Sequence, residues 1–496
     1  MNMQLLILIV YAAGLLAISW WSTRLQKSGT AGEALNYLLA GRNMPTLLIV
    51  VMLTGLAVGG ASTVGVAERA YTQGFSAGWY NAAWGMGGIV VGLFFARHFR
   101  RMNVRTVPEM MGMMFGPGTR MLSVVNQLLV MISITSLQYV AGGAILTALL
   151  PDVFTFNQGM MASALIFIAI TVVGGYWASG LTNVVNVVVI YVGIVVALYQ
   201  TLVHHGGFAE VRAALPPAMP GGGGWMDLVS GLGVATVAAY VVVMITMAVS
   251  TQAVAQISFA ARDERTARRG LFLGGVLILP AGFLCAMFGI VAAAVFPDLD
   301  KAALALPMLA AGLTPLVGGV FLAALWAADV STAVGLLMGC STLVMEDIVK
   351  KVYTKPISER REMFLSRIVV LFVSLLSFGL ALTVVGILKT ITTALAITTS
   401  FTLLIAAGIY FPKLCKRAAG FPVVLASLIL WVLWTYAPST RIGPELIYVE
   451  WIVCGGIFLA CALLCREPAG LLVERREAAP AKSGLGVRPK AEGARS

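Results

Sequence analysis

The chain has 496 residues, of which 59% are hydrophobic and only 11% are charged. A soluble protein of this length needs far more charge to cover its surface, so the composition excludes a soluble globular enzyme. It predicts an all-α polytopic protein of the lipid bilayer. The formal net charge of +12 would suit a protein that binds nucleic acid. The positions of the basic residues along the chain instead follow the membrane topology described below. We therefore expect no nucleic-acid partner.

Apolar runs separated by polar breaks predict about thirteen transmembrane helices. They cover residues 4–22, 44–70, 76–97, 119–149, 157–177, 181–203, 227–250, 270–296, 309–346, 364–385, 388–411, 421–437 and 446–465. Each can cross a hydrocarbon core of about 30 Å at about 1.5 Å per residue, with 421–437 at the short limit. The first run has no basic segment before it and no small-residue cleavage site, so we interpret it as a retained span.

The lysines and arginines predict the orientation. With the N-terminus outside, 28 of the 33 basic residues fall in cytoplasmic segments, which the positive-inside rule requires. We therefore expect an inner (plasma) membrane protein with a cytoplasmic C-terminus, whose basic segments face anionic lipid. Residues 466–496 lack apolar periodicity and are expected to be disordered. No phosphate-binding GxxxxGK[ST] motif and no nucleophile–base set is visible, so we expect neither an enzyme nor an organic cofactor.

The stretch from Leu53 to Ala70, LTGLAVGGASTVGVAERA, is unusual for a membrane helix. Small and polar residues interrupt it, namely Gly55, Gly59, Gly60, Ser62, Thr63 and Gly65. Adjacent glycines weaken a helix, and irregular backbone at membrane depth persists only where protein covers it or where it lines a cavity. Two interpretations follow: a discontinuous helix that binds an ion and a solute, or close helix packing through small residues.

The run 309–346 contains Asp329 near its middle, and a charge at this depth points to function. Ala328, Ser331 and Thr332 stand at i, i+3 and i+4, so they share one helix face. One carbonyl and two hydroxyls form an oxygen-only partial shell that suits a small alkali cation. The alternative is that both hydroxyls bond the preceding turn of their own helix, which spacing alone favours.

Five motifs in the same order resemble the sodium/solute symporter family over nearly the whole chain. They are AGRNMP, LAVGGASTVGVAERAYTQGFSAGW, RTVPEMMGMMFG, ARDERTARRG and STAVGLLMGCSTLVMEDI. The resemblance implies the LeuT-like fold of two inverted five-helix repeats, here 44–203 and 227–411, with the first helix of each repeat broken at the midplane. The core would then be 44–411, with 1–43 and 412–465 peripheral to it.

The resemblance also implies a sodium site. Its ligands would be the backbone carbonyls of Gly55, Val58 and Ala328 and the hydroxyls of Ser331 and Thr332. Asp329 falls where most members have an apolar residue, and it is an additional candidate ligand. Many members carry Asp at Asn183 to serve a second sodium, so Thr182 and Asn183 are candidates for a second site whose carboxylate is missing here.

We assign the solute site to the broken helix and the spans that face it, with contacts from Gly59, Gly60, Ser62, Thr63, Trp84 and Gln138. The predicted function is secondary active transport: sodium-coupled symport of a small organic solute by alternating access, with a carboxylate or amino acid favoured. Arg69 would favour a carboxylate if it reaches the cavity. The alternatives are a transporter-like solute sensor and a proton-coupled symporter. The sequence determines neither the solute nor the oligomeric state.

Overall fold

The computed structural model describes residues 3–28, 36, 38–217, 219, 223–353, 357–384 and 386–469. The expected disordered tail therefore lies outside the described residues from position 470 onward. Within these ranges the protein is almost entirely helical, with two isolated β-bridges and no β-strand. Nine helical runs are long and apolar enough to cross a membrane, or ten with one bent pair. The count of thirteen spans stays a prediction.

Helices follow one another along the whole described chain. In the first half they are α1 (Met3–Ser28), α3 (Thr46–Ala57), α4 (Gly60–Gln73), α5 (Trp79–Val90), α6 (Ala96–Met102), α7 (Val107–Phe115), α8 (Pro117–Leu149), α9 (Phe156–His204) and α10 (Phe208–Ala214). In the second half they are α11 (Gly233–Ser250), α12 (Gln252–Ala260), α13 (Glu264–Ile278), α14 (Ala281–Val295), α15 (Ala305–Ala311), α16 (Pro315–Leu343), α17 (Lys350–Val352), α18 (Glu359–Ala381), α19 (Ile387–Ala396), α20 (Thr399–Tyr410), α21 (Gly420–Tyr436) and α22 (Leu446–Leu464).

Two helices are broken near their middles. Between α3 and α4, Val58 (φ −102°, ψ 55°) and Gly59 (φ −90°, ψ 177°) leave the helical conformation. Between α11 and α12, Thr251 is extended at φ −75°, ψ 140°. Each break frees carbonyls at the end of one half-helix and N–H groups at the start of the next. The predicted discontinuity within Leu53–Ala70 is therefore present, and the second half contains its counterpart.

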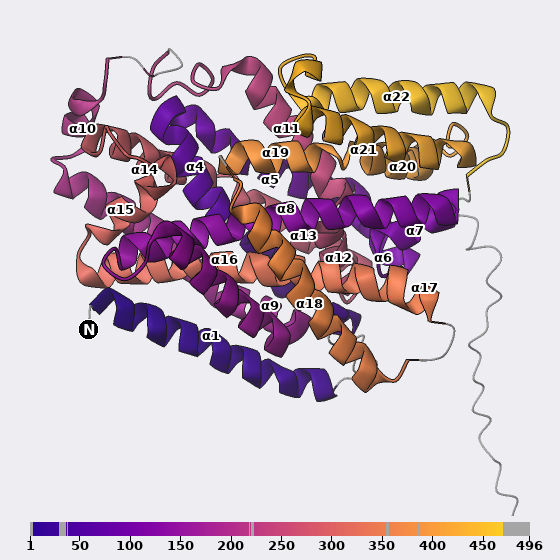
Figure 1. The fold of residues 1–496 in the computed structure, drawn as a ribbon, viewed down its shortest axis with the longest axis horizontal. Coiled ribbons are helices and arrows are strands. Elements are labelled where there is room, and N and C mark those ends of the chain that lie inside the picture. The colour runs from indigo at the N-terminus through magenta and orange to yellow at the C-terminus, as the bar shows by residue number, and fades with distance from the viewer. Residues whose placement is uncertain are drawn as a thin grey trace, which may run out of the picture.

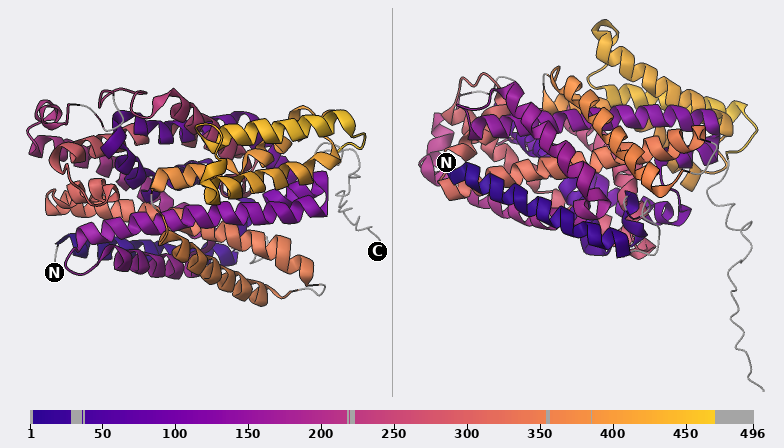
Figure 2. Two further views of the ribbon diagram at one scale, coloured as in Figure 1. Left: turned by 45° about the horizontal axis from the view of Figure 1, so that its top comes forward. Right: turned by 60° about the horizontal axis from the view of Figure 1, so that its bottom comes forward.

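The long helices lie side by side along the longest axis of the molecule, with α8 and α16 through its centre and α1 along one edge (Figures 1 and 2). The helix α16 packs against α8, α9 and α1, and α3 packs against α9 and α13. The pair α21 and α22 lies at the opposite edge from α1. This arrangement buries α16 almost completely, because helices cover it on several sides.

The helix α9 corrects one prediction. The expected break between spans 157–177 and 181–203 is absent, because the backbone is helical from Phe156 to His204. Gly180 stands at the expected break, where an added Cβ would lie 3.2 Å from Met44 Cε and 3.6 Å from Leu48 Cδ1. This glycine allows two helices to approach closely and does not end one. The segment between α9 and α11 contains the short helix α10.

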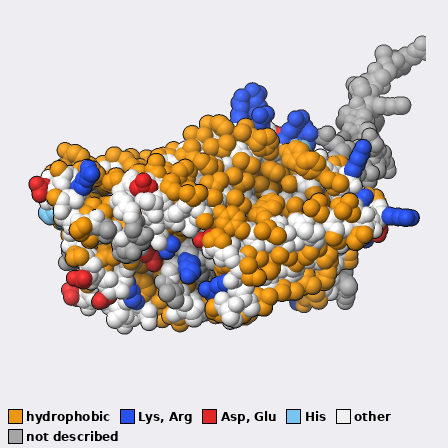
Figure 3. Space-filling view, turned by 90° about the horizontal axis from the view of Figure 1, so that it is seen from above, with side chains coloured by type: hydrophobic (Ala, Val, Ile, Leu, Met, Phe, Trp, Pro, Cys, Tyr) orange, Lys and Arg blue, Asp and Glu red, His pale blue; other side chains and the backbone are white. Residues whose placement is uncertain are grey.

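Several basic segments that the sequence assigns to one side of the membrane meet at one end of the molecule. Arg97 and Arg101 pair with Glu264, and Arg105 and Lys350 pair with Glu346 at 2.7 and 2.8 Å. The helices α7 and α17 lie at this end, and α10 and α15 lie at the other (Figure 1). Hydrophobic side chains cover much of the face between the ends in Figure 3, which suits a lipid-facing surface.

Candidate sodium and solute sites

The break of the first helix lies against the middle of α16. The Thr332 hydroxyl donates to the Gly55 carbonyl at 2.9 Å, across 277 positions of sequence. The Ser331 hydroxyl donates to the Ala328 carbonyl at 2.9 Å, within its own helix. The alternative interpretation therefore describes Ser331 but not Thr332, whose hydroxyl crosses to α3. The five residues that the resemblance implied as sodium ligands are all buried at this junction.

The chemistry of the junction suits a hard cation. The Gly55 and Ala57 carbonyls lie in the last turn of α3, at the negative end of its helix dipole. The Ser62 hydroxyl donates to one of them, Ala57, at 2.5 Å, and also contacts the Gly59 carbonyl at 2.9 Å. Carbonyl and hydroxyl oxygens are ligands for Na⁺ and poor ligands for soft metals. The described residues contain no group of three or more His, Cys, Asp or Glu side chains that could hold a metal ion.

The Asp329 carboxylate faces the start of α4. It is fully buried, and a Cβ added to Gly60 would collide with both of its Oδ atoms. Gly60 is the first residue of α4, so the carboxylate lies at the positive end of that half-helix. Only glycine permits this approach. The sequence suggested Asp329 as an additional sodium ligand, but its proximity to Gly60 is visible only in the fold.

Gly59 connects this junction to the larger cavity. A Cβ added at Gly59 would lie 2.5 Å from Thr332 Oγ1 and 3.5 Å from Gln138 Oε1. Thr332 belongs to the candidate sodium site, and Gln138 lines the cavity. The backbone of one residue therefore lies between the two sites, with no side chain separating them.

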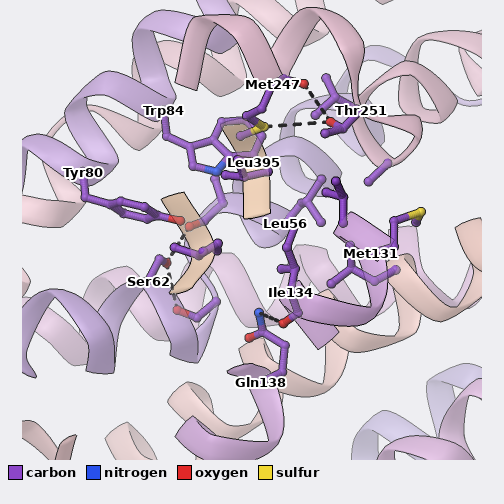
Figure 4. Close-up of a pocket in the computed structure, with 17 residues that line it drawn as sticks. Leu56, Ser62, Tyr80, Trp84, Met131, Ile134, Gln138, Met247, Thr251 and Leu395 are labelled. Atoms are coloured by element: carbon purple, nitrogen blue, oxygen red, sulfur yellow. Dashed lines mark hydrogen bonds between the residues drawn. The ribbon is translucent and has the colours of Figure 1, made fainter. Parts of the chain in front are cut away.

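The cavity has about 530 Å³ of empty volume and lies between the two helix breaks. Figure 4 shows Tyr80 and Trp84 on one side of it and Leu56, Met131 and Ile134 on the other. The full lining is Leu56, Ala57, Gly59, Ser62, Tyr80, Trp84, Val130, Met131, Ile134, Gln138, Met247, Thr251, Ala253, Val254, Leu336, Ile391 and Leu395. None of these lining residues is charged. A mostly apolar lining with a few polar groups is typical of a small-molecule site.

Four of the six residues predicted to contact the solute line the cavity, and two do not. Gly59, Ser62, Trp84 and Gln138 line the cavity, whereas Gly60 and Thr63 are absent from its lining. Gly60 faces Asp329 instead. The Thr63 hydroxyl donates to carbonyls of its own helix, Gly59 and Gly60, at 3.1 Å each. Binding of a solute to the four lining residues stays a prediction.

Three further residues named from the sequence lie outside the cavity lining. Arg69 lies near Tyr240 of α11. Thr182 lines a cavity of about 300 Å³ between α1, α9 and α16. Asn183 lines another of about 290 Å³, and it lies close against Gly55. Thr182 and Asn183 therefore face different spaces, although both of these spaces reach Ser331.

Gln127 of α8 supports the second helix break, and no pattern in the sequence selected it. Its side chain donates to the Ser250 carbonyl at 2.8 Å and accepts from the Gln252 N–H at 3.0 Å. It thus satisfies backbone groups on both sides of the α11–α12 break, which are otherwise costly to bury. In the sequence, Gln127 is distinguished only by being an amide side chain within an apolar span. Thr251, at this break, and Met131 of α8 were also missed as lining residues.

Comparisons with known proteins agree with this geometry. The model of the sodium:solute symporter family matches residues 37–424. The chain is 24% identical to the sodium/glucose cotransporter of Vibrio parahaemolyticus, over 71% of this chain and 69% of that protein. It is 21% identical to the high-affinity proline transporter PutP of Bacillus subtilis, over 80% and 86%.

A solved structure shows the same fold. The substrate-bound, outward-open Na⁺-coupled sialic acid symporter superimposes with a TM-score of 0.75 at 17% identity, covering 95% of this chain and 99% of that one. The described helices, their two breaks and this neighbour identify the LeuT-like fold. Together with the match over most of its length, they show that the chain belongs to the sodium:solute symporter family.

Proposed function

We propose that this protein is a sodium-coupled symporter that moves a small organic solute across the membrane by alternating access. The observation that carries the proposal is the bond between Thr332 Oγ1 and the Gly55 carbonyl. It brings the oxygen-rich end of a broken half-helix against two hydroxyl-bearing residues of α16. In this proposal Na⁺ binds the carbonyls of Gly55, Val58 and Ala328 and the hydroxyls of Ser331 and Thr332.

Coupling follows from the position of Gly59. Because its backbone lies between Thr332 and Gln138, sodium at the α3 end fixes the backbone that the solute contacts. Each ligand then raises the affinity for the other by the same factor, as linkage requires. The division into a core of 44–411 with peripheral segments 1–43 and 412–465 belongs to this proposal, as do the outside N-terminus and cytoplasmic C-terminus.

The solute of this chain does not follow from any single relative. The relatives are named for glucose, proline and sialic acid, which differ in size, charge and polarity. The chemical class of the solute must therefore be inferred from the residues that line the cavity. It offers aromatic faces from Tyr80 and Trp84 and hydrogen-bonding groups from Gln138, Ser62 and Thr251.

Solute counterflow in proteoliposomes tests the proposal. Vesicles are loaded with a candidate solute that thermal-shift screening has identified, and uptake of the labelled solute is measured with Na⁺ or K⁺ outside. We expect uptake to need Na⁺, and an imposed inward sodium gradient to concentrate the solute. A sensor would bind the solute without moving it, and a proton-coupled symporter would respond to a pH gradient in K⁺ medium.

A further inference from the structure

We propose that Gln252 is a positioning residue for transport, which ties the second helix break to the cytoplasmic end of the molecule and so opposes opening of the solute cavity on that side. Gln252 is the first residue of α12 and follows Thr251, which lines the cavity. Its side chain is fully buried. This role of Gln252 rests on the proposed function, because it concerns how the cavity opens.

The Gln252 side chain bonds the segment that precedes α7. Its Oε1 accepts from the Val107 N–H at 2.8 Å, and its Nε2 donates to the Arg105 carbonyl at 3.3 Å. Val107 is the first residue of α7, so its N–H has no partner within that helix. Because Val107 is fully buried, the bond to Gln252 satisfies a backbone group that is costly to bury alone.

The helix that carries the candidate sodium ligands holds the same segment. The Thr106 hydroxyl donates to Asp347 Oδ2 at 2.7 Å, and Arg105 Nη1 lies 2.7 Å from Glu346 Oε1. Both acidic residues belong to the π-helical turn Val344–Val349, which continues α16. These contacts join two of the sequence motifs, RTVPEMMGMMFG and STAVGLLMGCSTLVMEDI. Through this segment α12, which begins at the cavity, is linked to the end of α16.

Gln127 of α8 fixes Gln252 from the other side. It accepts from the Gln252 backbone N–H at 3.0 Å, so both the backbone and the side chain of Gln252 are held. Alternating access requires parts of the core to rock against one another around the solute site. Gln252, Thr106 and Val107 are all fully buried, so an opening between α12 and the segment before α7 must break the bonds of Gln252.

The test measures how often the cavity opens towards the cytoplasm. The reporter is Ala255→Cys, a buried position of α12, in the full chain without its native cysteines. An impermeant thiol reagent is applied to inside-out membrane vesicles, and the labelling rate is compared with and without Gln252→Met. Methionine keeps a similar length but neither donates nor accepts as an amide does. Loss of two hydrogen bonds should speed the labelling on the order of tenfold.

Two controls separate this role from general loosening. Asn126→Leu removes an equally buried amide of α8, which donates to the Val424 carbonyl of α21 at 3.4 Å. The native Cys285, fully buried in α14, is kept as the single cysteine in a second series. Unchanged labelling of position 255 in folded Gln252→Met would overturn the inference, and so would an equal increase in Asn126→Leu or at Cys285.

Val107→Pro tests the same bond from its other partner. The first position of a helix tolerates proline, and Thr106 before it is extended at φ −137°, ψ 154°, as a residue before proline prefers. The substitution removes the N–H that bonds Gln252. We expect faster labelling of position 255 in Val107→Pro as well, and no further increase when it is added to Gln252→Met.

The outcomes distinguish this role from the proposed function. If Gln252→Met fails to fold, Val107→Pro provides the test, and unchanged labelling in that variant would overturn the inference. Native sodium-driven uptake together with unchanged labelling in the variants would overturn the role of Gln252 alone. Absence of sodium-driven uptake by native protein would contradict the proposed function itself.

Discussion

The Thr332 hydroxyl provides the sharpest test of the sodium site. Thr332 is 2% exposed, and its hydroxyl contacts the Gly55 carbonyl at 2.9 Å. Thr332→Val keeps nearly the same volume and removes one oxygen ligand. A hydrogen bond to a charged group contributes about 1.5–3 kcal/mol, and each 1.4 kcal/mol changes an affinity tenfold. We therefore expect the apparent Kd for sodium to rise about 10- to 100-fold.

The measurement is a sodium titration of purified protein at constant ionic strength, followed by calorimetry or by tryptophan fluorescence. The matched control is Thr201→Val in α9, where the threonine is also buried but bonds the Ala197 carbonyl of its own helix at 2.7 Å. Ser331→Ala should weaken sodium binding in the same way. A Thr332→Val protein that folds and binds sodium with native affinity would refute the site, and so would an equal loss in Thr201→Val.

Three further predictions concern the helix break, the ion pairs and the topology. Gly60→Ala should abolish sodium-dependent solute binding because its Cβ would collide with Asp329, whereas Gly335→Ala, which meets nothing within 4 Å, should bind normally. Arg120→Met should lower stability by about 3–5 kcal/mol, because it leaves Asp347, whose side chain is fully buried, without the bond from Arg120 Nε at 2.6 Å. A cysteine at position Arg265, in a cysteine-free background, should react with an impermeant thiol reagent only after the cells are opened.

Each of these predictions has a result that contradicts it. Normal solute binding by Gly60→Ala would mean that the break tolerates a side chain and that Asp329 can move away from it. Restored stability is expected when Arg120→Met is combined with Asp347→Leu, because no buried charge then remains. If the double variant is no more stable than Arg120→Met, the ion pair is not the cause. Labelling of position 265 on intact cells would reverse the orientation.

Features that depend on local composition could be predicted from the amino-acid sequence. Apolar runs identified a helical membrane protein because the bilayer leaves few other ways to satisfy backbone groups. Adjacent Gly59 and Gly60 located the first helix break because glycine weakens a helix wherever it stands. The spacing of Ala328, Ser331 and Thr332 placed three oxygen-bearing groups on one face. The motifs identified the family and, through it, the fold.

Which of these groups meet depends on the packing of the helices. Local spacing allowed the Thr332 hydroxyl to bond its own helix, and packing of α16 on α3 directs it to Gly55 instead. In the same way, packing brings Asp329 to Gly60 and Gln127 to the second break, and it leaves Arg69 out of the cavity lining. Contacts across hundreds of residues depend on how helix faces fit together, which no periodicity within one helix encodes.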